Sequence, residues 1–415
     1  MTQLLTLEDL DLARLRGVVV LVRVDFNVPM KEGKVTDDTR IEEALPTIRE
    51  LSAAGARLLL CSHCGRPKGE RNLKYTLRPV ADRLAVLLGK PVLFADDAIG
   101  EPAASVAAKL GDGDVALLEN LRFHAGEEKN DPEFAKALAA PATAYVDDAF
   151  GSAHRAHASV TGVLPYLPRK AAGRLMVREV EALSKLLGEP PRPFAAILGG
   201  AKIEGKIDTL ENLLPRLDIL MVGGGMANTF LAAQGLDLKA SLVERDRLDL
   251  ARTILERAAA KGTEVLLPSD LVVTDSFDNP QVVQTVAAAE IPADFLAVDV
   301  GPRTREAFAA AVARAHTLFW NGPLGVFEKP PFDAGTRAVA LALADCPGFT
   351  LIGGGETVAA VHQAGVADRI GHVSTGGGAS LEFLAGKALP GVAALARATA
   401  GSTGSIGATG SDTAG

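Results

Sequence analysis

Two lysines beside a glycine turn give the clearest chemical signal in the chain. Lys202 and Lys206 are spaced one helical turn apart, and they follow a short apolar run that ends in Gly199 and Gly200. This pattern predicts a strand, a tight turn and a helix, with both ammonium groups on one side of the helix N-terminus. Because free N–H groups and the helix dipole also favour negative charge there, the stretch predicts a phosphate site.

The same residues fit most of a P-loop. Positions 200–206 match G-x-x-x-x-G-K, the first seven positions of that motif. The next residue is Ile207, where a P-loop needs a Ser or Thr to hold magnesium. Ile203 and Ile207 also have the spacing of core positions in a helix already begun. A P-loop ATPase is therefore kept only as an alternative.

Basic side chains follow several predicted strands in the first half of the chain. The strands are expected at 17–24, 57–61, 114–118 and 143–146, and the residues that follow them are Arg23, His63, Arg66, Arg122 and Arg155, with Arg40 just inside the first helix. Ligands of a parallel sheet bind at the carboxyl ends of its strands, and guanidinium groups match phosphate and carboxylate geometry. The first half thus predicts a basin for a small polyanion, with Asp25 and Asn27 available to its hydroxyl groups.

Glycine clusters replace these arginines in the second half. They follow predicted strands at 223–225, 353–355 and 376–378, and N-G-P-L-G occupies 321–325. Glycine turns that lead into helix N-termini suit the phosphates and flat base of a nucleotide. Neither 223–227 nor 353–357 has the G-x-G-x-x-G spacing, so a dinucleotide-binding fold is disfavoured.

Strands alternate with helices in both halves, which predicts an α/β protein with two doubly wound parallel-sheet domains of three α/β/α layers each. An amphipathic helix over 173–189, followed by prolines, is expected to join them as a hinge. The expected domains are 1–172 and 190–390, with a segment over 391–397 returning toward the first. Residues 398–415, almost entirely Ala, Gly, Ser and Thr, predict a disordered tail.

Composition narrows the possible partners. The 415 residues carry a net charge of −8, which argues against nucleic acid as the main partner. No apolar run reaches the ~18 residues of a membrane helix. The acidic N-terminus lacks the features of a signal peptide, so we expect a cytoplasmic protein without a membrane partner.

Cys61 and Cys64 form a C-x-x-C sequence. Such a pair can be a redox centre or half of a zinc site. The chain has no second C-x-x-C, and this one ends a predicted strand instead of opening a helix, where a reactive thiolate would be favoured. We expect small buried thiols.

A set of motifs in a fixed order carries a family resemblance. They are R-V-D-F-N-V-P (23–29), S-H-C-G-R-P-K-G (62–69), E-N-L-R-F (119–123), D-D-A-F-G-S-A-H-R-A-H-A-S (147–159), G-G-A-K (199–202), W-N-G-P-L-G-V-F-E (320–328), G-G-G-E-T (353–357) and V-S-T-G-G-G-A-S-L-E (373–382). On these motifs the chain resembles phosphoglycerate kinase from about Leu21 to Leu395.

The resemblance implies reversible transfer of the acyl phosphate of 1,3-bisphosphoglycerate to MgADP, giving 3-phosphoglycerate and MgATP, by direct in-line transfer after domain closure. The first domain would bind the phosphoglycerate through Asp25, Phe26, Asn27, Arg40, His63, Cys64, Gly65, Arg66, Arg122 and Arg155. The second would bind the nucleotide through Gly200, Ala201, Lys206, Gly224, Ala297, Asn321, Pro323, Glu328, Gly354, Gly355, Glu356 and Thr357, with Glu328 at the ribose. The transferring phosphoryl group would face Arg40, Lys202, Lys206, Gly376, Gly377 and Gly378.

The chain departs from the family pattern at a few positions. Glu356 stands where the family usually has Asp, the carboxylate associated with Mg²⁺, so the metal geometry or its water shell must adjust to one more methylene. Cys64 replaces a common Leu, and Gly205, Lys239 and Ala297 also differ. We expect a monomer, and a non-catalytic nucleotide- or anion-binding protein is the second alternative.

Overall fold

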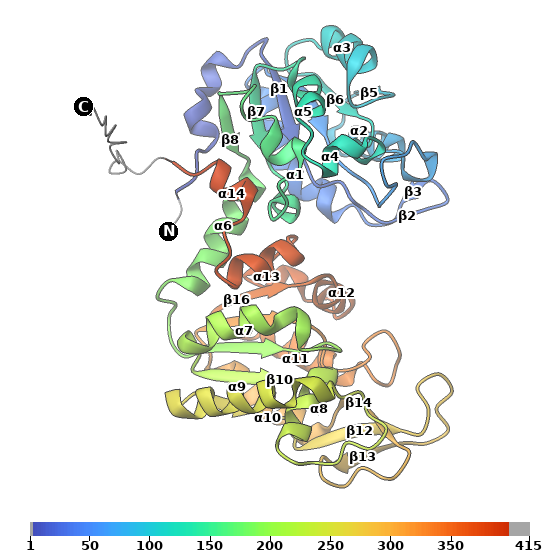
Figure 1. The fold of residues 1–415 in the computed structure, drawn as a ribbon, viewed down its shortest axis with the longest axis vertical. Coiled ribbons are helices and arrows are strands. Elements are labelled where there is room, and N and C mark those ends of the chain that lie inside the picture. Colours follow the sequence, from blue (N-terminus) through green and yellow to red (C-terminus); the bar gives the residue numbers. More distant parts are fainter. Residues whose placement is uncertain (1–2, 398–415) are drawn as a thin grey trace, which may run out of the picture.

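Two parallel sheets of six strands form the framework of the molecule. The computed structural model describes residues 3–397, so the tail predicted over 398–415 lies outside the described residues. One sheet domain lies at each end of the long axis, and α6 (Arg174–Leu187) runs between them (Figure 1). The predicted α/β class, with two doubly wound parallel sheets, is confirmed. Within residues 3–397 no helix is long and apolar enough to cross a membrane.

The first sheet has the strand order β5-β6-β4-β1-β7-β8, and every pair in it is parallel. Its strands are β1 (Val19–Arg23), β4 (Arg57–Cys61), β5 (Val92–Ala95), β6 (Val115–Leu118), β7 (Ala144–Asp147) and β8 (Lys170–Ala172). Neighbouring side chains of a strand point to opposite faces. Val20 and Val22 accordingly join the core under α1 (Thr39–Ala53) and α2 (Arg78–Leu88), whereas Leu21 joins the core under α3 (Gly100–Lys109) and α5 (Pro132–Ala139).

Among the strands of the first domain, two features were not predicted. One is β8, and the other is a hairpin of β2 (Met30–Lys31) and β3 (Lys34–Val35). These strands are two or three residues long, which is too short to show an alternating pattern. The short helix α4 (Ala125–Glu128) completes the domain.

The second sheet has the order β11-β10-β9-β15-β16-β17 and is also parallel throughout. Its strands are β9 (Phe194–Leu198), β10 (Ile219–Val222), β11 (Glu264–Leu266), β15 (Thr317–Asn321), β16 (Phe349–Gly353) and β17 (His372–Val373). The order reverses between β9 and β15. The crevice at the carboxyl ends of two such strands is where open α/β sheets bind ligands.

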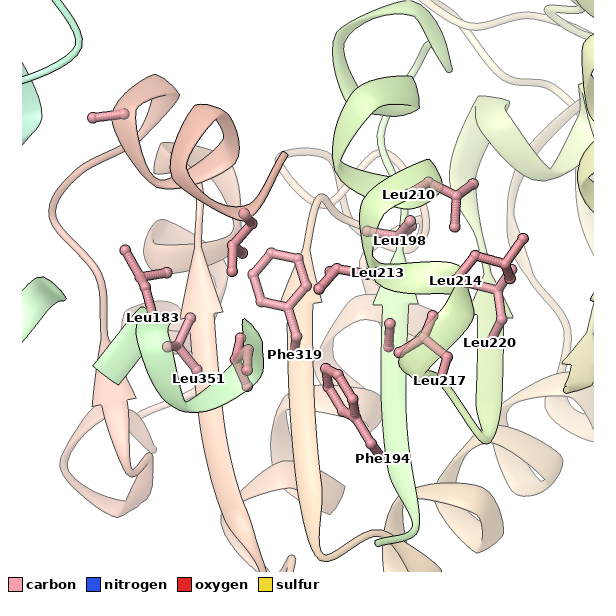
Figure 2. Packing of buried hydrophobic residues seen from close by; sticks show 14 of the residues in the cluster. Leu183, Phe194, Leu198, Leu210, Leu213, Leu214, Leu217, Leu220, Phe319 and Leu351 are labelled. Carbon is pink, nitrogen blue, oxygen red and sulfur yellow. The ribbon is translucent and has the colours of Figure 1, made fainter. Parts of the chain in front are cut away.

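Helices cover both faces of this sheet. One face packs on α6, α7 (Ile207–Leu213), α8 (Gly224–Ala233), α9 (Leu248–Lys261) and α13 (Gly378–Leu384), and the other on α10 (Pro302–Arg314), α11 (Ala334–Ala344) and α12 (Gly355–Gln363). Figure 2 shows Phe194 and Phe319 of neighbouring strands beneath the leucines of α7. Burying such a side chain contributes roughly 1.5–3 kcal/mol, so this layer fixes the strand ends firmly.

Two apolar stretches of the second half, 271–274 and 295–298, are predicted by their composition to be strands, but they do not extend the parallel sheet. With one unpredicted strand they form a separate antiparallel sheet, β13-β12-β14, built from β12 (Asp270–Thr274), β13 (Val283–Ala287) and β14 (Leu296–Val300). No helix lies between these strands. Short connections join antiparallel strands, whereas parallel neighbours need a crossover, so the missing helices were the signal for this arrangement.

The helix predicted directly after Gly199 and Gly200 begins later than expected. Residues 204–206 form a 3₁₀ turn, and α7 starts only at Ile207. Lys206 bends back so that its Nζ donates a hydrogen bond to the Gly199 carbonyl oxygen at 2.6 Å. Gly205 also lacks a side chain and weakens a helix locally. The idea that Lys202 and Lys206 share one turn of a helix is therefore wrong.

Both connections between the domains are visible. Asp148, in the loop after β7, accepts hydrogen bonds through Oδ1 from the backbone N–H groups of Leu175 and Met176, at 2.9 and 3.2 Å, and so anchors the start of α6. The chain end returns through α14 (Pro390–Ala394). Its Leu395 carbonyl oxygen accepts from the N–H of Leu5, whose own carbonyl accepts from Ala172 of the first sheet, both at 2.8 Å.

Candidate functional site

One ion pair and several hydrogen bonds join residues that are expected to form the basin, at the carboxyl ends of β1 and β4. Arg40 Nη1 lies 2.7 Å from Asp25 Oδ2. Asn27 Oδ1 accepts from the Gly65 N–H at 2.9 Å, and Arg122 Nη1 donates to the Gly65 carbonyl at 2.7 Å. Residues from three separate motifs thus meet at one edge of the sheet, as the strand-end pattern predicted.

Arg23 is the most deeply buried of the strand-end cations, followed by Arg122 and His63. It is 1% exposed and lies behind His63, with its Nη2 3.1 Å from His63 Nδ1. Since Arg23 is two residues beyond Leu21, it points to the same buried face of the sheet. The expectation that it opens into the basin is therefore wrong. Burial first, and then the charges of the surrounding arginines, lower the pKa of His63 well below its ordinary value.

The other expected substrate residues differ in how they face the basin. Phe26 and Cys64 have their side chains in the hydrophobic core, so only their backbone atoms are available to a ligand. Arg66 is exposed. Arg155 is half-buried, and its Nε donates to His154 Nε2 at 3.1 Å.

The expected thiol chemistry fits the structure. Cys61 and Cys64 are free and buried. Burial raises the pKa of Cys61 to about 12 and that of Cys64 to about 11. Neither side chain therefore carries the thiolate that redox or metal chemistry requires.

A cavity of about 300 Å³ lies beside the carboxyl end of β9, between the second parallel sheet and the antiparallel sheet. Seven of the residues expected at the nucleotide line it, namely Gly200, Ala201, Gly224, Ala297, Pro323, Glu328 and Glu356. Its apolar wall comes from Leu242, Leu271, Phe277, Leu296, Val298 and Leu324. Sequence reasoning missed this wall, because it belongs largely to the antiparallel sheet. An apolar slot with a few polar groups at its mouth suits a flat base.

Backbone-to-backbone packing forms the floor of this cavity. A Cβ atom on Gly199 would lie 2.2 Å from the Pro323 carbonyl oxygen. One on Gly224, which has φ +64°, would lie 2.7 Å from the Gly200 carbonyl. These glycines are therefore required for the loops after β9, β10 and β15 to meet.

The remaining expected nucleotide residues support the cavity from beneath. Asn321 Nδ2 donates to the Gly353 carbonyl at 2.7 Å, and the Gly322 N–H donates to Thr357 Oγ1 at 2.6 Å. Both side chains are buried. Gly354, with φ +92°, precedes the first turn of α12, which Gly355 begins. Burial lowers the pKa of Lys206, and the nearby Glu356 carboxylate opposes that change.

The loop before α13 brings the second domain against the first. Arg40 Nη2 lies 3.5 Å from the Thr375 carbonyl oxygen. A Cβ on Gly376 would lie 2.4 Å from the Phe150 ring, so this glycine allows close contact between the domains. Arg40 and the glycines at 376–378 are therefore neighbours across the interdomain boundary. Lys202 is exposed, before the 3₁₀ turn.

Comparisons with known proteins show the family of this chain. A model of the family described as phosphoglycerate kinase matches residues 7–387. The chain belongs to the phosphoglycerate kinase family. It is 55% identical over 391 residues to a phosphoglycerate kinase of Moorella thermoacetica, covering 94% of this chain and 98% of that one. It is 53% identical over 400 residues to that of Koribacter versatilis, with the same two shares.

Solved phosphoglycerate kinases share the fold. The Coxiella burnetii structure superposes with a TM-score of 0.84 at 41% identity, covering 95% of this chain and 99% of that one. The Pyrococcus horikoshii structure gives 0.83 at 34% identity, covering 94% and 98%. The protein is accordingly a kinase that transfers a phosphoryl group in the glycolytic phosphoglycerate kinase reaction, and the P-loop ATPase alternative is set aside.

Proposed function

We propose that the first-domain basin binds the phosphoglycerate and that the second-domain cavity binds the nucleotide, as the family resemblance implies. The observation that carries this assignment is the contact of Arg40 with the loop before α13. This contact joins the cationic residues of the first domain to the second domain, whose apolar cavity is lined at its base by glycines. Asp25, Asn27, His63, Gly65, Arg66, Arg122 and Arg155 would hold the sugar acid, with the backbone of Phe26 and Cys64.

The nucleotide assignment follows from the lining of the cavity. The base would lie against Ala297 and its apolar neighbours, and Glu328 at the rim would bind the ribose hydroxyls. The phosphates would extend along Gly200, Ala201 and Lys206 toward the N-terminus of α12, where backbone N–H groups favour anions. Asn321, Pro323 and Thr357 would shape the loops, which is supported by the buried side-chain contacts of Asn321 and Thr357 and by the hydrogen bond from the Gly200 N–H to the Pro323 carbonyl.

The proposed chemistry needs no general base in the direction of acyl phosphate formation, because the attacking group is already a carboxylate. The task is positioning and neutralising charge on the transferring oxygens. Arg40, Lys202, Lys206 and the N–H groups of residues 376–378 would do this together. Since the half-sites belong to different domains, transfer would follow domain closure, which also excludes water.

Magnesium would enter with the nucleotide as part of the substrate. Within residues 3–397 no cluster of three or more His, Cys, Asp and Glu residues could hold a metal ion. Mg²⁺ bound to a nucleotide commonly needs only one or two carboxylates besides phosphates and water. Glu356, exposed in the first turn of α12 and lining the cavity, fits that requirement. The ion would neutralise phosphate charge during transfer.

A coupled spectrophotometric assay of ATP-dependent 3-phosphoglycerate phosphorylation tests the proposal. We expect saturable turnover with both substrates and Mg²⁺. Arg122→Ala should raise the KM for 3-phosphoglycerate, and Leu271→Ala should raise the KM for ATP. An Arg122 variant affected only toward ATP would contradict the assignment of the half-sites. We also propose a cytoplasmic location. Because one chain supplies both half-sites, we further propose that the protein is a monomer. Sedimentation analysis would test the oligomeric state.

A further inference from the structure

A row of buried hydrogen bonds runs behind the basin from Glu127 to His63. The Ser159 hydroxyl donates to Glu127 Oε1 at 2.6 Å. Arg23 Nε donates to Ser159 Oγ at 2.9 Å, and Arg23 Nη2 lies 3.1 Å from His63 Nδ1. All four side chains are buried. Three of them (Glu127, Ser159 and Arg23) have no part in the mechanism proposed above.

The chemistry of a guanidinium group fixes the direction of this row. Arginine has five N–H donors and no acceptor. His63 Nδ1 must therefore accept, which leaves the single hydrogen of the neutral ring on Nε2. Ser159 Oγ likewise accepts from Arg23, so its own hydrogen points to Glu127. Each hydrogen bond of the row then has a defined donor and a defined acceptor.

Glu127 anchors the far end of the row. Its second oxygen, Oε2, accepts from the backbone N–H of Ser159 at 2.9 Å. Ser159 lies in a π-helical turn (Ala158–Gly162), and both its N–H group and its hydroxyl donate to the same carboxylate. Burial raises the pKa of Glu127, and the charge of Arg23 opposes that rise. Two donors onto two oxygens are the pattern of an ionised carboxylate, which also balances the buried guanidinium.

We infer that Glu127 and Ser159, acting through Arg23, are positioning residues that hold His63 as the neutral tautomer with its hydrogen on Nε2. This inference rests on the proposed place of His63 in the phosphoglycerate basin. His63 then offers the substrate one hydrogen-bond donor and no charge, and the arginines alone balance the anion. The charged groups around the His63 ring are Arg23, Arg40, Arg122 and Arg155, and those around Glu127 are Arg23, Arg122 and His157.

The tautomer can be measured without substrate. The full chain, labelled with ¹⁵N-histidine, is studied by long-range ¹H–¹⁵N correlation, and a His63→Gln spectrum identifies the His63 signals among those of seven histidines. We expect a bare Nδ1 and a protonated Nε2 that stay unchanged between about pH 8 and about pH 5.5, where an ordinary histidine titrates. Hydrogen on Nδ1, or titration within this range, would overturn the inference.

Two variants test the row itself. Ser159→Ala and Glu127→Gln should each give a mixture of His63 tautomers and raise the KM for 3-phosphoglycerate about 3- to 10-fold, the effect of one hydrogen bond. The KM for ATP should not change. Thr161→Ala is the matched control, because Thr161 belongs to the same π-helical turn but bonds only the His157 carbonyl and the Asn130 side chain. It should leave the tautomer and both KM values as they are.

Two further results separate the inference from the proposed function. If both variants fold but keep the wild-type tautomer and KM, the row does not position His63 and the inference fails. If His63→Gln leaves the KM for 3-phosphoglycerate unchanged, His63 is not a substrate residue and the proposed site fails. The tautomer measured in the free protein is independent of that second result.

Discussion

The carboxylate of Glu179 and the ring of His372, which are 193 positions apart in the sequence, lie 2.9 Å from each other between α6 and β17. The other oxygen of Glu179 accepts from the N–H and the hydroxyl of Thr375, at 2.7 and 2.9 Å. Thr375 is the residue whose carbonyl lies near Arg40. One buried side chain of the connecting helix therefore fixes the loop that contacts Arg40 of the first domain.

Replacing Glu179 should weaken both stability and turnover. Glu179→Ala removes the acceptor of three donors, one on the buried His372 and two on the half-buried Thr375, which costs about 2 kcal/mol or more of unfolding free energy. Because the loop before α13 loses its support, kcat should also fall. Urea unfolding and the coupled assay measure the two effects. Glu181→Ala, on the exposed face of the same helix, is the control and should change neither.

Arg40 should be essential for turnover. Arg40→Ala removes a cation that contacts both the basin and the loop of the second domain, so kcat should fall roughly 10²-fold or more, as when one charge-stabilising donor is lost. Arg49→Ala, at an exposed position of α1, is the matched control. Near-normal turnover of the Arg40 variant would exclude its catalytic role.

Glu356→Asp should retain activity. Asp is the residue that the family resemblance leads us to expect here, and a side chain shorter by one methylene would change the reach of the carboxylate toward the proposed Mg²⁺. We therefore expect a changed ratio of Mg²⁺- to Mn²⁺-supported rates. Steady-state rates with each ion measure this ratio, and Glu306→Asp on α10 is the control. A complete loss of activity would mean that the surrounding loop has adapted to Glu.

Asp148 should make stability depend on pH. Burial raises the pKa of Asp148 from 3.8 to about 7. Between these pH values the folded protein holds a proton that the unfolded chain has lost. The stabilisation that this proton gives the folded state is full below about pH 4 and declines as the pH rises through 7. Asp148→Asn keeps an oxygen acceptor for α6 and removes the titration. Between pH 5 and pH 8 the free energy of unfolding of the variant should rise by about 2–3 kcal/mol relative to that of the wild type.

Urea unfolding at several pH values checks that gain. Each protein gives a curve of unfolding free energy against pH. Subtracting the wild-type curve from the Asp148→Asn curve cancels the contributions of other buried carboxyl groups. The exposed Asp368→Asn should give a flat difference over the same range. Parallel curves for the Asp148 variant and the wild type would contradict the prediction.

Gly199→Ala should damage the cavity beside β9 that we propose for the nucleotide. Its Cβ would lie 2.2 Å from the Pro323 carbonyl, and neither backbone can move aside easily, so we expect a loss of about 2 kcal/mol or more together with weaker ADP binding. In Gly205→Ala the new Cβ meets nothing within 4 Å, and this control should be neutral or slightly stabilising. Calorimetric titration with ADP and thermal unfolding distinguish the two variants.

The sequence was sufficient to predict those strands and strand-end residues whose signal lies in neighbouring positions of the chain. Each strand of the first sheet from β1 to β7 was an apolar run, and the polar residues after it had to emerge at one edge of a parallel sheet. Contacts between distant residues carried no such signal. Lys206 delays α7 by bonding a carbonyl seven positions earlier, and Glu127 meets Ser159 across 32 positions. The burial of Arg23 also had no local signal, because helices cover both faces of this sheet and the alternation of the strand indicates only which face a residue shares.

The hydrogen bonds that join Leu5 to Ala172 and to Leu395 have a consequence for folding during synthesis on the ribosome. The first sheet is complete once β8 has emerged, yet its edge is joined to the last described helix of the chain. Domains generally fold in the order of their synthesis. Here the earlier domain acquires its final hydrogen bonds only after the later one has been translated, so the nascent N-terminal half must persist for a time without them.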